Sequence, residues 1–182
     1  FKNLINHYGA QNIVNSENTK NLYQKDDKVS TKTDMIKEAQ KLLLTWYVDD
    51  ERLFKVLKNI ISAEDFIDPL YNKAATILFS QYDADGKVVP AKIINAFESK
   101  EEQNEVALLF STSISQITDN NEESEDFTEM TSAEKETYLN QLVKKIKSYS
   151  IEEKMRNSID MKVFQECSKM KAELQNMYII LH

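Results

Sequence analysis

Glycine and proline each occur only twice in this chain of 182 residues. A β-sandwich or a β-barrel needs frequent turns, and glycine and proline are among the commonest turn residues. Their scarcity argues against such folds and favours long helices with few breaks. The length of 182 residues is enough for one full domain with an appendage or for two small domains, and the hydrophobic fraction of 41% is enough to form a core. We therefore predict an all-α fold.

Apolar residues recur every three or four positions behind capping signals, which is the pattern of amphipathic helices. One of these signals, Thr131 with Glu134, has the form of a capping box. The predicted helices span residues 34–47, 50–60, 70–83, 90–98, 101–113, 132–157 and 161–180. A further box that begins at Ser150 is open to two interpretations, a kink in the long helix or a new helix start.

These helices divide the chain into three parts. Residues 1–33 are interpreted as the end of a preceding domain and a linker, because residues 13–33 show no sustained period. Residues 34–130 are predicted to form a compact helical bundle, and residues 131–182 a long helix with a C-terminal helical hairpin. Because the chain begins with Phe1 rather than methionine, we expect it to be a piece of a longer protein.

The charge distribution favours a protein partner. The net charge is −7, although residues 137–182 hold eight Lys or Arg against five Asp or Glu, so the first 136 residues carry −10. An acidic chain is poorly suited to neutralise a phosphate backbone, so we expect no direct nucleic-acid binding. Cys167 is the only cysteine, and no apolar run is long enough to span a membrane. We therefore expect a cytoplasmic protein without membrane contact.

The residues that usually carry catalysis or bind metals form no recognisable group. Two glycines cannot build a phosphate-binding loop of the common types. His7 and His182 lie at opposite ends of the sequence, and Cys167 lies on the apolar stripe of the last predicted helix. A buried thiol is the simplest interpretation of that cysteine. We predict no catalytic residue, no metal site and no cofactor.

The terminal sequence NMYIILH contains five consecutive apolar residues at positions 177–181. A single stripe on an amphipathic helix cannot bury five consecutive positions, so some side chains should point outward. The predicted partner-binding residues are Leu174, Met177, Tyr178, Ile179, Ile180 and Leu181. The alternative is that the run covers the long helix or the bundle.

Three motifs follow one another within residues 38–97. They are AQKLLL at residues 39–44, DDE at residues 49–51 and SAEDFIDPLY at residues 62–71. In this order they resemble the helicase-binding C-terminal domain of bacterial DNA primase. The third motif is interpreted as structural and is expected to place Phe66 in the core. Asp68 and Pro69 would then start the helix that carries Tyr71.

The resemblance extends over about residues 34–182 and implies an interaction module of primase. Such a module binds the N-terminal domain of the replicative hexameric helicase, recruits primase to the replication fork for RNA primer synthesis, and modulates the helicase. It also implies that the terminal hairpin provides most of the binding and that the module alone is a monomer. The parent chain would be a DNA primase, which is a DNA-directed RNA polymerase, whereas this piece is expected to be no enzyme.

Two other classes of function compete with this interpretation. The same motif pattern is similar to the N-terminal collar domain of the replicative helicase itself, which should self-associate. An independent enzyme is the third class, and the sequence offers no set of catalytic residues for it.

Overall fold

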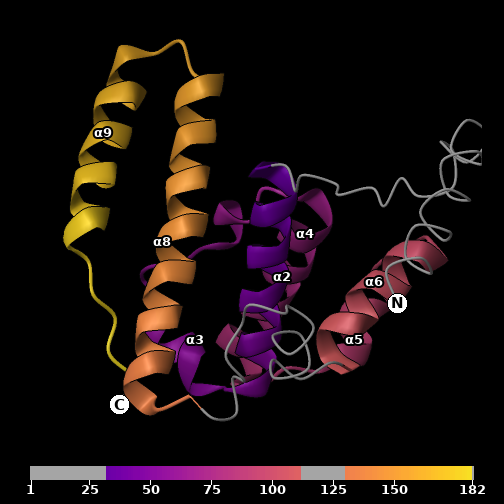
Figure 1. The fold of residues 1–182 in the computed structure, drawn as a ribbon. Coiled ribbons are helices and arrows are strands. Elements are labelled where there is room, and N and C mark those ends of the chain that lie inside the picture. The colour runs from indigo at the N-terminus through magenta and orange to yellow at the C-terminus, as the bar shows by residue number, and fades with distance from the viewer. Residues whose placement is uncertain (1–31, 112–129, 182) are drawn as a thin grey trace, which may run out of the picture. The chain divides into compact units, whose positions relative to one another are not determined.

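The computed structural model describes residues 32–111 and 130–181 of the chain. Within these two ranges the chain forms seven α-helices and one short 3₁₀-helix and contains no β-strand, which confirms the predicted all-α fold (Figure 1). Residues 1–31 of the predicted linker, residues 112–129 and His182 lie outside the described residues, whereas Lys32 and Thr33 already belong to the first described helix. None of the described helices is long and apolar enough to cross a membrane.

The bundle is built from five helices that follow one another along the chain. They are α2 (Lys32–Asp49), α3 (Arg52–Leu57), α4 (Pro69–Asp85), α5 (Pro90–Ile94) and α6 (Lys100–Ser111). The 3₁₀-helix η1 (Ala63–Asp65) lies between α3 and α4. Helix α2 packs against α3, α4, α6 and the later helix α8, so it is the central helix of the bundle.

Helix α8 (Ser132–Asn157) and helix α9 (Met161–Asn176) form the hairpin that follows the bundle. They lie side by side in Figure 1, in orange and yellow. The first half of α8 belongs to the bundle core, because Leu139, Val143 and Ile146 are buried there together with residues of α2 and α4. The long helix is therefore shared between the bundle and the hairpin.

The segment between η1 and α4 shows how the local sequence starts a helix. Phe66 is buried and packs edge-on against Phe79, with ring centroids 6.2 Å apart. The Asp68 side chain accepts hydrogen bonds from the backbone N–H groups of Leu70 and Tyr71, and Pro69 occupies the first helical position. The N–H that proline lacks would have no partner in the first turn of a helix, so the proline costs α4 nothing.

Tyr71 faces the core from the first turn of α4. Its side chain is buried, and its hydroxyl donates a hydrogen bond to the Glu105 carboxylate on α6 at 3.2 Å. Burial and the neighbouring carboxylate raise the pKa of this phenol well above its ordinary value, so it stays protonated and remains a donor. The contact ties α4 to α6.

Two predicted helices are shorter in the structure. Helix α3 covers only part of the predicted span 50–60, because it ends at Leu57 and the chain tightens into a turn in which the backbone N–H of Ile60 bonds to the carbonyl of Leu57. The predicted helix over 90–98 ends early in a turn closed by the backbone N–H of Phe97. Both turns allow the buried side chains that follow them to reach the core.

The prediction of a helix over 161–180 is wrong at its C-terminal end. Helix α9 stops at Asn176, and Met177 already has extended backbone angles, φ −71° and ψ 135°. The chain then continues without helical structure as far as Leu181. The predicted helix over 132–157 is confirmed, and because α8 runs through Ser150 without interruption, no new helix starts there.

Candidate interaction surface

Capping residues fix the starts of both hairpin helices. The Thr131 hydroxyl accepts a hydrogen bond from the backbone N–H of Glu134, and the Glu134 carboxylate accepts one from the backbone N–H of Thr131. The Asp160 carboxylate accepts one from the backbone N–H of Lys162 at 2.8 Å and so caps α9. Only residues 158–160 separate the two helices, and so short a connection makes them antiparallel neighbours.

The hairpin has a small hydrophobic core of its own. Ile151 of α8 and both Cys167 and Leu174 of α9 are buried in it. Three partly buried side chains, Met155, Val163 and Met177, pack around them. Leu174, one of the predicted partner-binding residues, therefore serves the hairpin core rather than the surface. Cys167 is a buried free thiol.

Ion pairs attach the hairpin to the bundle at two places, through Glu152 and through Lys147 of α8. Glu152 of α8 binds Lys32 of α2 at 2.8 Å and Lys171 of α9 at 2.9 Å. The hydrogen bonds from these two lysines lower the pKa of the Glu152 carboxyl to about 2. Lys147 of α8 binds the buried Asp65 of η1 at 2.9 Å. These contacts join α8 to elements on both sides of it.

The apolar run at residues 177–181 alternates between buried and exposed side chains. Ile179 is only 2% exposed, whereas Tyr178 is 62% and Ile180 is 49% exposed. Met177 and Leu181 are partly buried and pack against the bundle core. A period of two is typical of extended chain, in which successive side chains point to opposite sides. The six predicted partner-binding residues therefore do not share one face.

Three exposed apolar side chains that the sequence analysis did not single out as a contact surface lie at the tip of the hairpin. Ile159 in the connection is fully exposed, Met161 is 68% exposed, and Phe164 is 51% exposed. Helical spacing puts Phe164 on the same side of α9 as Cys167, three positions away, yet only Cys167 is buried. The available sequence signal is Ile159 itself, an isoleucine between two capped helix ends where no stripe can bury it.

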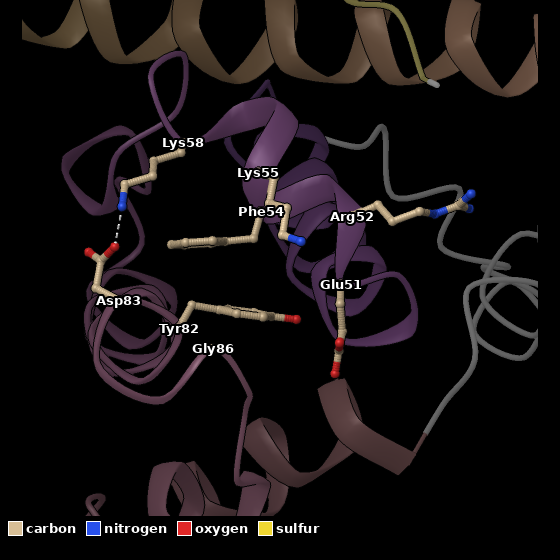
Figure 2. Close-up of a pocket in the computed structure, with 8 residues that line it drawn as sticks. All are labelled: Glu51, Arg52, Phe54, Lys55, Lys58, Tyr82, Asp83 and Gly86. Carbon is tan, nitrogen blue, oxygen red and sulfur yellow. Dashed lines mark hydrogen bonds and ion pairs between the residues drawn. The ribbon is translucent and has the colours of Figure 1, made fainter.

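A cavity of about 320 Å³ lies between α3 and the C-terminal end of α4 (Figure 2). The rings of Phe54 and Tyr82 stack with centroids 4.4 Å apart, and Lys58 forms an ion pair with Asp83 beside them. Burial and the Glu51 carboxylate raise the pKa of the Tyr82 phenol, which donates a hydrogen bond to a backbone carbonyl of α2. The phenol of Tyr82 stays protonated and hydrogen-bonded, and the charged side chains beside it are of both signs. The cavity therefore offers no group that we can assign to catalysis or to the binding of a particular ligand.

No protein-family model matches the chain, and no curated protein or solved structure is significantly similar to it. The geometry therefore carries the functional interpretation. Within the described residues, the hairpin tip combines large exposed apolar side chains with a scaffold held by its own core and by ion pairs. We define the tip surface as Ile159, Met161 and Phe164, and take it as the candidate interaction surface.

Proposed function

We propose that this chain is an interaction module of DNA primase that binds the N-terminal domain of the replicative hexameric helicase through its helical hairpin. The observation that carries the proposal is the tip surface, Ile159, Met161 and Phe164, whose side chains are about half to fully exposed. The motif order within residues 38–97 supports the choice of partner, since it resembles the helicase-binding domain of primase.

Exposed apolar groups at the end of a projecting element favour association with another protein. Their burial in an interface removes apolar surface from water, and large apolar anchors at the centre of an interface commonly contribute 2 kcal/mol or more each. The connection of three residues between α8 and α9 limits the conformations of the tip, so little order has to be gained on binding. The tip surface therefore has both the chemistry and the rigidity of a docking site.

We call residues 177–181, which follow α9, the tail, and the exposed side chains of this tail are a second contact in the proposal. Tyr178 and Ile180 point away from the core and are accessible. Ile179 and Leu174 are buried and would have to leave their cores to reach a partner. We therefore narrow the predicted partner-binding residues of the tail to Tyr178 and Ile180 and add the tip surface to them.

The proposed role has consequences for catalytic activity, for the number of copies bound and for localisation. The module binds the helicase, and the polymerase activity resides elsewhere in the parent primase. Several primases on one helicase ring would gain from multivalency, because tethering raises the effective concentration of each contact. The proposed partner places the protein in the cytoplasm, where the free thiol of Cys167 would stay reduced.

The test is a calorimetric titration of this chain against the isolated N-terminal domain of the replicative helicase from the same source. We expect saturable binding, and we expect the chain alone to sediment as a monomer. A negative titration with both proteins folded would overturn the proposal.

Self-association of the chain would instead favour the alternative, a collar domain of the helicase. The exposed tip surface also fits this alternative, because copies arranged in a ring would bury it against one another. Sedimentation of the chain at rising concentration separates the two functions. A ring-forming assembly without affinity for the helicase domain would support the collar.

A further inference from the structure

Asn140 is a buried polar residue of α8 whose amide binds the backbone of one residue in the tail. Its side-chain nitrogen donates a hydrogen bond to the carbonyl of Ile179, and its side-chain oxygen accepts one from the N–H of Ile179, both at 2.7 Å. The same nitrogen also donates to the carbonyl of Glu136 at 2.8 Å. The amide therefore makes the pair of bonds that a neighbouring β-strand would make.

Two further residues of α8 continue this contact on the same helix face. The Glu136 carboxylate accepts a hydrogen bond from the backbone N–H of Leu181 at 2.9 Å. The Lys144 ammonium donates one to the carbonyl of Gln175 at 3.2 Å, in the last turn of α9 just before the extended residues begin. Glu136, Asn140 and Lys144 are each four positions apart, so they form one row along α8. We call them the polar row.

The spacing of the polar row matches the rise of an extended chain. Four residues of α-helix advance about 6 Å, and two residues of extended chain advance about 6.6 Å. A helix that offers a polar side chain every fourth residue can therefore bind every second residue of a peptide lying antiparallel to it. Glu136 and Asn140 bind Leu181 and Ile179 in this way.

The tail also joins the two hydrophobic cores. Ile179 is buried in the bundle core, Leu174 is buried in the hairpin core, and Met177 packs against both. Its inward side chains, at positions 177, 179 and 181, alternate with the exposed Tyr178 and Ile180. Release of the tail would uncover apolar surface beside α8 and remove one of the links between α9 and the bundle.

From these contacts we infer that the polar row and the apolar surface beside it form a binding site for an extended peptide with alternating apolar residues. In this chain its own residues 177–181 occupy the site and act as a latch between the hairpin and the bundle. The latch opens locally, because it is a single segment with one face in solvent and few backbone hydrogen bonds to α8. The inference is independent of the identity of the partner at the tip surface.

Peptide binding to a shortened chain tests the site directly. A variant that ends at Asn176 leaves the contacts of Asn140 and Glu136 empty, and a synthetic peptide with the sequence of residues 177–181, MYIIL, is the probe. We expect the peptide to bind this variant, and to bind the full chain at least about tenfold more weakly, because the tethered tail competes at high effective concentration. A peptide with Asp in place of Ile179 is the control and should not bind. Absence of binding to the folded shortened chain would overturn the site.

Hydrogen exchange on the full chain tests the latch without truncation. We expect the backbone N–H of Ile179 to exchange faster than that of Val143 in the bundle core, because the tail opens without unfolding of the core. Asn140→Leu should speed the exchange of Ile179 at least about tenfold, since it removes both hydrogen bonds to that residue. Gln141→Leu, at the exposed neighbouring position, is the matched control and should leave the rate unchanged.

Two outcomes of the exchange experiment contradict the latch. One is equal exchange rates for Ile179 and Val143 in the full chain, which would mean that the tail opens only when the whole core unfolds. The other is an Ile179 rate that Asn140→Leu leaves unchanged while the protein stays folded. The exchange result also decides the question if the shortened chain fails to fold.

Discussion

Single buried polar residues hold this small protein together at points that apolar packing alone would leave undefined. The Asp65 carboxylate accepts hydrogen bonds from the backbone N–H of Ser62 at 2.9 Å and from the Lys147 ammonium at 2.9 Å. The Asn140 side chain donates a hydrogen bond to the carbonyl of Ile179 and accepts one from its N–H, and so fixes the position of the tail. A buried polar group that loses its partners is costly, so each of these residues favours one arrangement of its neighbours over the alternatives.

Phe66 should contribute far more to stability than the residues on either side of it. Phe66→Ala is expected to lower the free energy of unfolding by about 3–5 kcal/mol, because it leaves a cavity in the bundle core. Pro69→Ala should cost much less, since Asp68 still caps α4. Ile67→Ala, at an exposed neighbouring position, is the control. Urea denaturation of the three variants gives the comparison, and equal losses for Phe66→Ala and Ile67→Ala would contradict it.

The Glu152 cluster should make stability depend on pH in the acidic range. Lys32 and Lys171 lower the pKa of Glu152 to about 2 in the folded state, from an ordinary value of 4.5. The stabilisation is therefore complete above about pH 4.5 and is lost as pH falls towards 2. Because both lysines are largely exposed, we expect a contribution of about 1 kcal/mol or less.

Glu152→Gln tests this contribution by removing the titrating group. Its free energy of unfolding should be lower than that of the parent at pH 6, and the difference should disappear near pH 2. Glu166→Gln, at an exposed position of α9, is the control for the loss of one surface carboxylate. A constant difference between Glu152→Gln and the parent at both pH values would show that the ion pairs are not its cause.

At the scale of helices, the starts of α8 and α9 are set by local chemistry, whereas the end of α9 has no local signal. Asp160 caps α9 and Thr131 caps α8 through bonds that span two or three residues, and the Thr131 capping box is predicted from the sequence alone. The end of α9 depends on Asn140, which is 39 residues from Ile179 in the sequence, so no local pattern reveals it. The five consecutive apolar residues at 177–181 carry no period of two in the sequence, so their alternation between buried and exposed appears only in the structure.

The tip surface shows a second limit of pattern reading. Helical spacing places Phe164 on the same broad stripe as Cys167, yet only Cys167 is buried. The stripe predicts which side of α9 is apolar, and the extent of the opposing core decides how much of that side is covered. The hairpin core holds Cys167 and Leu174 as its buried residues from α9. The proposed tip surface therefore lies at the opposite end of α9 from the predicted residues, of which Leu174 and Ile179 are buried.

The cap of α9 should have a measurable share in hairpin stability. Asp160→Ala is expected to lower the free energy of unfolding by about 1 kcal/mol, because the N–H of Lys162 loses its acceptor. Asp160→Asn should retain most of the stability, since asparagine caps helices about as well. Urea denaturation provides the measurement. Similar losses for the two variants would mean that the charge of Asp160, rather than its cap, is what matters.

At the scale of the whole described chain, α8 is the element that connects the bundle with the tip surface. Its first half contributes Leu139 and Val143 to the bundle core, and its second half contributes Ile151 to the hairpin core. The helix is continuous from Ser132 to Asn157, so its two halves share one rigid element. In the proposed function, this helix therefore holds the tip surface in a fixed position relative to the bundle.

The central claim is that the tip surface binds the helicase. The double variant Ile159→Ser with Phe164→Ser removes two of its three apolar side chains and should leave the fold intact, because both are exposed. The control is Leu108→Ser on α6, where the leucine is 51% exposed, as Phe164 is. Thermal melting of each variant confirms that it is folded.

The deciding measurement is the dissociation constant of each variant with the N-terminal domain of the helicase, determined by calorimetric titration. The account predicts that the double variant binds roughly 30-fold more weakly than the parent, which corresponds to about 2 kcal/mol, and that Leu108→Ser binds like the parent. A folded double variant that binds as tightly as the parent would contradict the claim and place the docking surface elsewhere.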